Sequence, residues 1–172
     1  LIKKENNWLE IKQGKYTSKI VGVSSEEYPI FPTYNSQACI KVSSVIFKEM
    51  IDKTIYSVSN DETRYHLNGV YFEISEKNEF KMVGTDGHRL SLINKLSPDS
   101  KMITHQGVII PRKGLNEIKK LLEGLDDSIE IAIEGSQFIL NHKSTTLMIR
   151  LIEGKYPNYQ QFIPHKLSQK VN

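Results

Sequence analysis

The stretch VGTDGHRLSL, residues 83–92, holds an acid, an imidazole and a guanidinium close together around a glycine. An aspartate beside a histidine can orient the imidazole as a general base. Asp86 and His88 would play these parts, and Thr85 and Ser91 are the hydroxyls nearby. Neither hydroxyl has the strained strand-to-helix setting that exposes a catalytic serine. The stretch therefore permits a hydrolase or transferase at Asp86 and His88 without an evident nucleophile.

A hairpin turn is the simplest alternative for the same residues, because Asp-Gly is a common tight-turn sequence. Asp86 would then accept backbone hydrogen bonds, and His88 would be solvated. The histidines lack the HxH or HxxxH spacing of metal sites, and there is no calcium-binding loop, so we expect no metal and no cofactor. The five are His66, His88, His105, His142 and His165.

Composition places the chain among ordinary globular proteins. It has 172 residues, of which 38% are hydrophobic and 25% charged, enough for a sizeable core. A single cysteine, Cys39, excludes a disulfide within the chain and favours a cytoplasmic setting. No apolar run approaches the ~20 residues that span a bilayer, so no membrane role is expected. The net charge of +3 permits a polyanionic partner without requiring one. The chain lacks an initiator methionine, so we expect a piece of a longer protein.

The predicted elements begin with a hairpin around Gly14 and a proline-containing linker at about 25–36. A strand in QACIKVSS precedes a helix of roughly four turns, capped by Ser43 or Ser44 and reaching Val58. Strands follow in YHLNGVYFEIS and EFKMVGTDGHRLSLINKLS, joined by the polar turn EKNE.

The same order then repeats. QGVIIP predicts a strand, RKGLNEIKKLLEGL an amphipathic helix, and SIEIAIEG, QFILNHKS and TTLMIRLIEG three strands with tight turns. The pattern predicts an α+β fold, in which two helices lie side by side on antiparallel sheet. Each helix would bury its apolar face and turn lysines outward.

Those outward faces could touch phosphates, but acidic side chains interleave with the basic ones, so a solvated surface is an equally good explanation. There is no basic and aromatic stripe of the kind that stacks single strands. A freestanding module for single-stranded nucleic acid stays an alternative. The segment LIEGKYPNYQQFIP lacks the upstream glycine of a phosphate loop. We expect its Tyr-Pro-x-Tyr part to be exposed beside Phe162, where it could wall an apolar groove.

Four motifs, RYHLNGVYFEI, VGTDGHRLSL, GVIIPRKGLNEI and LIEGKYPNYQQFIP, occur in an order and spacing that resemble the beta sliding clamp family of bacterial DNA polymerase III. The likeness covers nearly the whole chain. It implies a DNA-clamp fold, with two helices packed on antiparallel β-sheets and an internal pseudo-two-fold repeat. It also implies that residues 1–33 end a first clamp domain, 34–160 form a complete middle domain, and 161–172 lead into a third.

The resemblance implies a non-catalytic processivity factor, in which two full-length protomers form a homodimeric ring around double-stranded DNA. Polymerase subunits, the clamp loader and repair proteins would dock on it through short peptide motifs. The implied peptide-binding residues are Leu67, Thr85, Gly87, His88, Arg89, Leu90, Pro157, Gln161 and Phe162. The implied DNA-binding residues are Lys48, Lys53, Arg64, Tyr65, His66, Arg112, Lys113, Lys119 and Lys120. Gln161 departs from the family pattern, where a basic residue is expected in many relatives.

Overall fold

A β-hairpin forms most of the small unit into which the chain divides, Leu1–Tyr34. The computed structural model describes residues 2–3, 6–28, 34, 39–75, 79–96 and 105–164. Strand β2 (Trp8–Gln13) pairs antiparallel with β3 (Tyr16–Val21), and β1 (Ile2–Lys3) pairs with β2. Gly14 has a φ of 58°, so the predicted turn is confirmed.

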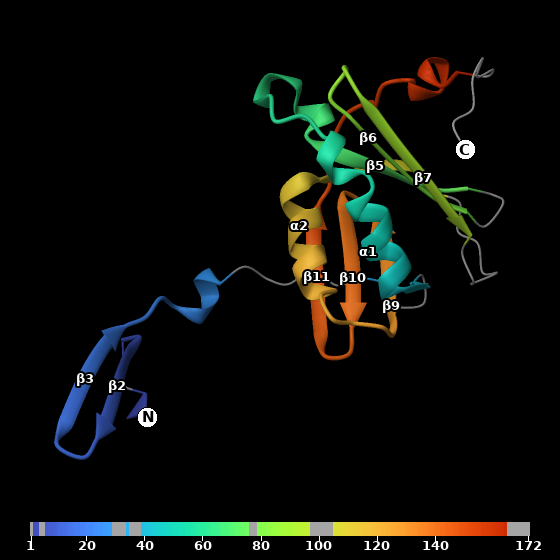
Figure 1. The fold of residues 1–172 in the computed structure, drawn as a ribbon. Coiled ribbons are helices and arrows are strands. Elements are labelled where there is room, and N and C mark those ends of the chain that lie inside the picture. The colour runs from blue at the N-terminus through green and yellow to red at the C-terminus, as the bar shows by residue number, and fades with distance from the viewer. Residues whose placement is uncertain are drawn as a thin grey trace. The chain divides into compact units, whose positions relative to one another are not determined.

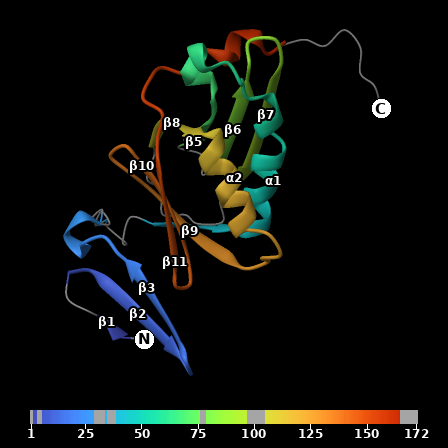
Figure 2. The same ribbon diagram turned by 90° about the vertical axis from the view of Figure 1, so that its left-hand side faces the viewer.

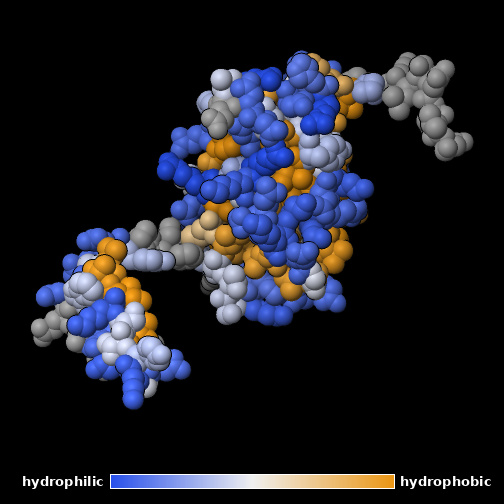
Figure 3. Space-filling view, turned by 60° about the vertical axis from the view of Figure 1, so that its left-hand side comes forward, coloured by the Kyte–Doolittle hydropathy of each residue, from blue (hydrophilic) through white to orange (hydrophobic). Residues whose placement is uncertain are grey.

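This small unit leaves large apolar side chains in solvent. Trp8, Ile20 and Val23 are exposed, and Figure 3 shows apolar patches on its surface. The predicted linker at 25–36 starts with a 3₁₀ turn at Ser25–Glu27, capped by the Ser24 hydroxyl. Residues 29–33 and 35–36 of that linker lie outside the described residues.

The large unit, Asn35–Asn172, contains two four-stranded antiparallel sheets. In one, the strand order is β11-β10-β9-β4, and in the other it is β7-β6-β5-β8. The first sheet has β4 (Ile40–Ser43), β9 (Ser128–Glu134), β10 (Gln137–His142) and β11 (Thr145–Arg150); the second has β5 (Gly69–Ile74), β6 (Glu79–Thr85), β7 (Leu90–Leu96) and β8 (His105–Pro111).

The two halves of this unit exchange their leading strands. Strand β4 opens the first half but pairs with β9 of the second, and β8 opens the second half but pairs with β5 of the first. Helices α1 (Ser44–Asp52) and α2 (Arg112–Leu121) each follow a leading strand and lie side by side (Figures 1 and 2). The predicted α+β architecture and its duplicated order are confirmed.

Three phenylalanines connect α1 with both sheets. Phe47 of α1 packs edge-on against Phe72 of β5, with ring centroids 5.8 Å apart, and stacks on Phe138 of β10 at 6.0 Å. All three are fully buried within one core that also takes in the apolar face of α2. The core therefore lies between the helix pair and the two sheets.

Helix α1 starts as predicted but is shorter than expected. The Ser43 side chain accepts from the Ile46 N–H, so Ser43 is the N-cap. The predicted four-turn helix is wrong, because α1 ends at Asp52 and a separate 3₁₀ turn spans Ile55–Ser57. The buried Thr54 hydroxyl donates back to the Met50 carbonyl at 2.8 Å, and the Thr54 carbonyl packs against Gly84 of β6.

The strand predicted from Tyr65 onward is also shorter. Residues Glu62–Leu67 form 3₁₀ turns, and β5 begins at Gly69. The Asp61 carboxylate accepts from the backbone N–H and the hydroxyl of Thr63, which starts the turn. Of the predicted EKNE turn, residues 76–78 lie outside the described part of the chain.

Candidate functional site

The TDGHR motif forms the tip of the hairpin between β6 and β7. The Asp86 carboxylate accepts from the backbone N–H groups of His88 at 2.9 Å and Arg89 at 3.0 Å, and from Arg89 Nε at 3.1 Å. These bonds lower the pKa of Asp86, with the His88 N–H the largest cause. The acid that would orient a catalytic histidine is instead bound to the backbone of its own turn, and the His88 side chain is exposed.

The buried Thr85 hydroxyl forms two further hydrogen bonds with the backbone of this turn. The hydroxyl donates to the Arg89 carbonyl at 2.7 Å and accepts from the Gly87 N–H at 3.1 Å, and the residue is buried. Gly87 adopts a φ of 89°, which a residue with a side chain rarely adopts. The motif is thus a hydrogen-bonded hairpin turn that presents His88 and Arg89 to solvent.

Arg64 links the 62–67 turn to this hairpin tip. Its Nη1 donates to the Asp86 carbonyl at 3.2 Å, and its Nε donates to Asp61 Oδ2 at 3.1 Å. The neighbouring Tyr65 and His66 rings lie edge to face, and Gly154 passes close to both. Figures 1 and 2 show the 62–67 turn, the hairpin tip and the 159–162 turn at one end of the large unit.

A second apolar cluster lies beside the hairpin, and we call it the apolar corner. Tyr156 Oη donates to the Val83 carbonyl at 3.1 Å, which joins segments 73 residues apart. Tyr71 stacks on Tyr156 with ring centroids 5.1 Å apart, and burial raises the pKa of Tyr71 to about 12. The corner consists of buried Leu67, Val83, Ile109, Tyr156 and Tyr159 with partly buried Tyr71, Leu90 and Ile152.

The expectation that the Tyr-Pro-x-Tyr segment is exposed is wrong for both tyrosines. Tyr156 and Tyr159 are only 8% and 6% exposed, because their rings pack on Tyr71. Phe162, by contrast, is 68% exposed at the end of the 3₁₀ turn Tyr159–Phe162. The apolar surface available to a ligand here therefore comes from residues flanking the tyrosines.

The peptide-binding residues implied by the resemblance lie in three places: in the apolar corner, in the segment that ends in the final 3₁₀ turn, and in the hairpin tip. Leu67 and Leu90 belong to the apolar corner itself. Pro157 lies between Tyr156 and Tyr159 in the sequence and is half-buried. Gln161 lies on the final turn and is exposed. Thr85, Gly87, His88 and Arg89 form the adjoining hairpin tip.

Sequence reasoning missed four corner residues: Tyr71, Val83, Ile109 and Ile152. A signal for Tyr71 was available, because the apolar alternation Val70, Phe72, Ile74 places Tyr71 on the opposite face of the strand. Its ring occupies the space beside Gly107 on β8, where a Cβ would overlap it. The contact between Tyr71 and Gly107 exists only because β5 pairs with β8, and no local sequence pattern indicates that pairing.

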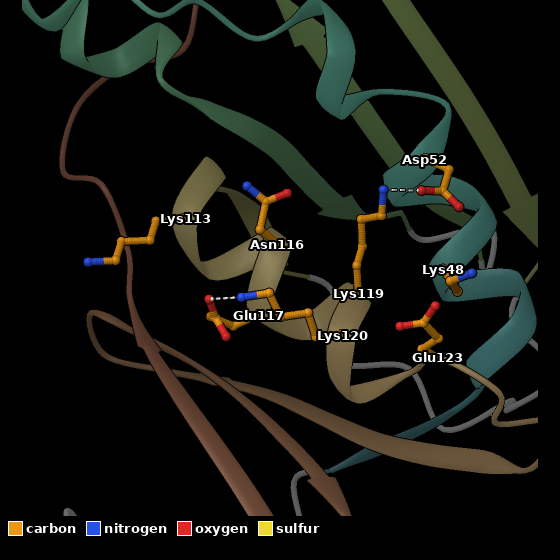
Figure 4. Close-up of a pocket in the computed structure, with 8 residues that line it drawn as sticks. All are labelled: Lys48, Asp52, Lys113, Asn116, Glu117, Lys119, Lys120 and Glu123. Atoms are coloured by element: carbon orange, nitrogen blue, oxygen red, sulfur yellow. Dashed lines mark hydrogen bonds and ion pairs between the residues drawn. The ribbon is translucent and has the colours of Figure 1, made fainter.

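A second surface lies over the two helices, where an open groove of about 580 Å³ runs between their outward faces. Four lysines, three carboxylates and one amide line it, as Figure 4 shows. The lining residues are Lys48, Asp52, Lys113, Asn116, Glu117, Lys119, Lys120 and Glu123. The prediction that both helices turn lysines outward is confirmed, and Figure 3 shows a largely hydrophilic surface on the large unit.

The remaining implied DNA-binding residues lie outside the groove lining. Lys53 caps the end of α1 and is exposed. Arg112 Nη1 donates to Asn60 Oδ1, and its backbone N–H donates to the Asn68 carbonyl at 3.0 Å. Arg64, Tyr65 and His66 are grouped with the hairpin tip rather than with the helices.

The described residues offer neither a metal-binding cluster nor a helix that could cross a membrane. Within ranges 6–28, 39–75, 79–96 and 105–164, no three His, Cys, Asp or Glu side chains are placed to hold a metal ion together. In the same part of the chain, no helix has the length and apolar character needed to cross a membrane. His165 lies outside the described residues.

Comparison with known proteins agrees with the fold. The family model for the central domain of the DNA polymerase III beta subunit matches residues 41–158. Similar relatives are the beta sliding clamps of Rickettsia felis, 37% identical over 95% of this chain and 43% of the relative, and of Bacillus subtilis, 32% identical over 99% and 45%.

Solved structures show the same fold. The DNA polymerase sliding clamp of Bacillus subtilis aligns with a TM-score of 0.87 and 28% identity over 96% of this chain and 43% of that one. The Bartonella birtlesii sliding clamp bound to griselimycin aligns with a TM-score of 0.82 and 29% identity over 94% and 44%. This chain spans less than half the length of the curated relatives it matches. By the match of its residues 41–158, the chain belongs to the DNA polymerase III beta subunit family.

Proposed function

We propose that this chain is the middle part of a DNA polymerase processivity factor, which encircles duplex DNA and docks the peptide motifs of replication and repair proteins. Two surfaces on one unit carry the proposal. The lysine-lined groove over α1 and α2 suits a phosphate backbone. The partly buried side chains at the edge of the apolar corner, with exposed Phe162 and the hairpin tip, suit a short peptide. The shared fold with solved sliding clamps supports both assignments.

The domain assignment is part of the same proposal. Residues 1–33 would end a first clamp domain, 34–160 would form the middle domain, and 161–172 would lead into a third. The exposed Trp8, Ile20 and Val23 of the small unit support the first assignment, because these side chains need an apolar partner surface. Two full-length protomers would close the ring.

The chemistry of such a factor is physical rather than covalent. A ring stays on DNA because it cannot leave without opening, so it needs no tight grip. Weak, salt-sensitive contacts to phosphates leave it free to slide. The groove fits this requirement, because its carboxylates offset most of the charge of its lysines.

Peptide binding tests the docking half of the proposal. A hexapeptide carrying a Leu-Phe pair, titrated into the ¹⁵N-labelled chain, should shift the amide signals of residues 85–90. An apolar anchor contributes about 1.5–3 kcal/mol when fully buried, so the two anchors of the pair together contribute about 3–6 kcal/mol, and we expect millimolar binding to this partial site. His88→Ala, which alters only an exposed side chain, should weaken binding by about threefold through loss of a rim contact.

A matched pair of leucine variants locates the site on strand β7. Leu90→Ala removes an apolar corner residue and should weaken peptide binding by about fivefold or more. Leu96→Ala makes the same change on an exposed side chain at the other end of the strand and should leave binding unchanged. If millimolar peptide moves no signal between residues 85 and 90, the docking role is wrong.

A further inference from the structure

The four lysines of the helix groove are not equally available to a ligand. Lys119 Nζ lies 2.5 Å from Asp52 Oδ1, in an ion pair that joins α2 to α1 (Figure 4). Lys120 Nζ lies 3.0 Å from Glu117 Oε1 within α2. Lys48 and Lys113 have no carboxylate within ion-pair distance among the described residues.

The two ion pairs differ in how readily they would release their lysine. The Lys120 and Glu117 side chains are 71% and 49% exposed and lie three residues apart on one helix. Such pairs are weak and exchange easily with water or a competing anion. Lys119 is less exposed, at 33%, and its partner comes from the neighbouring helix. Asp52 therefore holds its lysine more firmly than Glu117 does.

We propose that Asp52 is a negative regulator of DNA affinity, because it holds Lys119 away from the phosphate backbone. The groove then contacts duplex DNA chiefly through Lys48 and Lys113, with Lys120 available by exchange. This inference rests on the proposed function and names the residues that set the strength of its DNA contact. Neutralising Asp52 would free Lys119 for one more phosphate contact and would also remove a carboxylate that repels the phosphates.

The test measures binding of a short fluorescein-labelled duplex to this chain by anisotropy across a range of salt concentrations. Asp52→Asn should bind about threefold more tightly at low salt, and the slope of log K against log salt should steepen by ~0.9 as Lys119 gains a phosphate. Lys48→Ala and Lys113→Ala should each make the slope shallower by a similar amount, ~0.9. Lys119→Ala should change the slope little.

The comparison between Asp52→Asn and Lys119→Ala separates this role from a structural one. Both variants break the same ion pair, so a purely structural effect would shift DNA affinity in the same direction in both. The double variant Asp52→Asn with Lys119→Ala should return to the slope of the unmodified chain. Glu130→Gln is the matched charge control, because Glu130 pairs with Lys41 at 4.0 Å and alternates with core-facing Ile129 and Ile131.

Two outcomes would overturn the inference, and they are distinguishable. If the unmodified chain binds duplex but Asp52→Asn binds no more tightly than Glu130→Gln, Asp52 does not regulate affinity and the proposed function stands. If the unmodified chain shows no salt-dependent binding to duplex even at low salt, the DNA contact of the proposed function is wrong as well.

Discussion

Asp86 illustrates how one residue can be assigned two incompatible roles from sequence. Together with His88, Asp86 matches the residue types of a catalytic Asp–His pair. Together with Gly87, it matches the Asp-Gly sequence of a tight turn. The observed bonds go to the backbone N–H groups of His88 and Arg89, which leaves the His88 ring without that acid as a partner. A carboxylate that accepts two backbone bonds stabilises its own turn.

The pH dependence of this turn follows from the same bonds. The pKa of Asp86 is lowered, chiefly by the N–H groups of His88 and Arg89 and further by the Arg89 guanidinium. A folded-state pKa below the unfolded one means that ionised Asp86 stabilises the fold at neutral pH. This stabilisation is fully present above the ordinary aspartate pKa and is lost as the pH falls through the lowered value.

We therefore expect the ¹³C carboxyl signal of Asp86 to titrate below the ordinary aspartate range in an NMR pH series. Arg89→Ala should leave most of the lowering in place, because the backbone bonds are its largest causes. The protection of the His88 and Arg89 amides, measured relative to their intrinsic exchange rates, should fall only at pH values at which Asp86 becomes protonated. A normal or raised pKa for Asp86 would contradict this account of the turn.

At the scale of elements, packing decides where the helices end and what they tolerate. Helix α1 stops at Asp52 because Thr54 bonds back to it and packs its carbonyl against Gly84, where a Cβ would lie 2.3 Å away. Helix α2 approaches β11 so closely that Gly114 is fully buried, and a Cβ there would lie 2.5 Å from Ile149 Cγ2.

Gly114→Ala should destabilise the large unit although alanine is the better helix former. The gain in helix propensity is about 1 kcal/mol, whereas overpacking typically costs ~1–3 kcal/mol, so we expect a net loss of about 1 kcal/mol. Urea unfolding monitored by circular dichroism measures this. Asn116→Ala, on the exposed face of the same helix, should be neutral or slightly stabilising. A stabilised Gly114→Ala variant would mean that α2 and β11 pack less closely than described.

At the scale of the whole large unit, stability depends on contacts that join the two sheets through the helices. Phe47 is the clearest example, because its ring contacts Phe72 in one sheet and Phe138 in the other. The strand exchange adds a second link, since each half supplies the edge strand of the other half's sheet. The two sheets should therefore unfold together.

Phe47→Ala should lower the free energy of unfolding of the large unit by about 3–5 kcal/mol. Hydrogen exchange should accelerate together in β5 and β10, because both lose the same packing partner. Tyr56→Ala removes a similar ring from an exposed position and should change stability by less than ~0.5 kcal/mol. Faster exchange confined to one sheet would show that the sheets are independent.

Much of the fold follows from local patterns in the sequence. The hairpin at Gly14, the N-cap at Ser43, the apolar face of α2 and the three strands after it were all predicted, and so were the outward lysines. Each depends on interactions within a few residues, such as turn conformation, capping and the periodicity of apolar side chains. The family resemblance also depends on motifs that are contiguous in the chain.

Only the tertiary structure decided the features that depend on distant partners. Helix α1 ends where Thr54 packs against Gly84, and β4 and β8 each pair with a strand of the other half. Tyr156 and Tyr159 are buried because their rings pack on Tyr71. Lys119 forms an ion pair with Asp52, whereas Lys48 forms none with a carboxylate of the described residues. The physical reason is that burial and ion pairing depend on which surfaces meet in space, whereas local patterns only determine which surfaces each element presents.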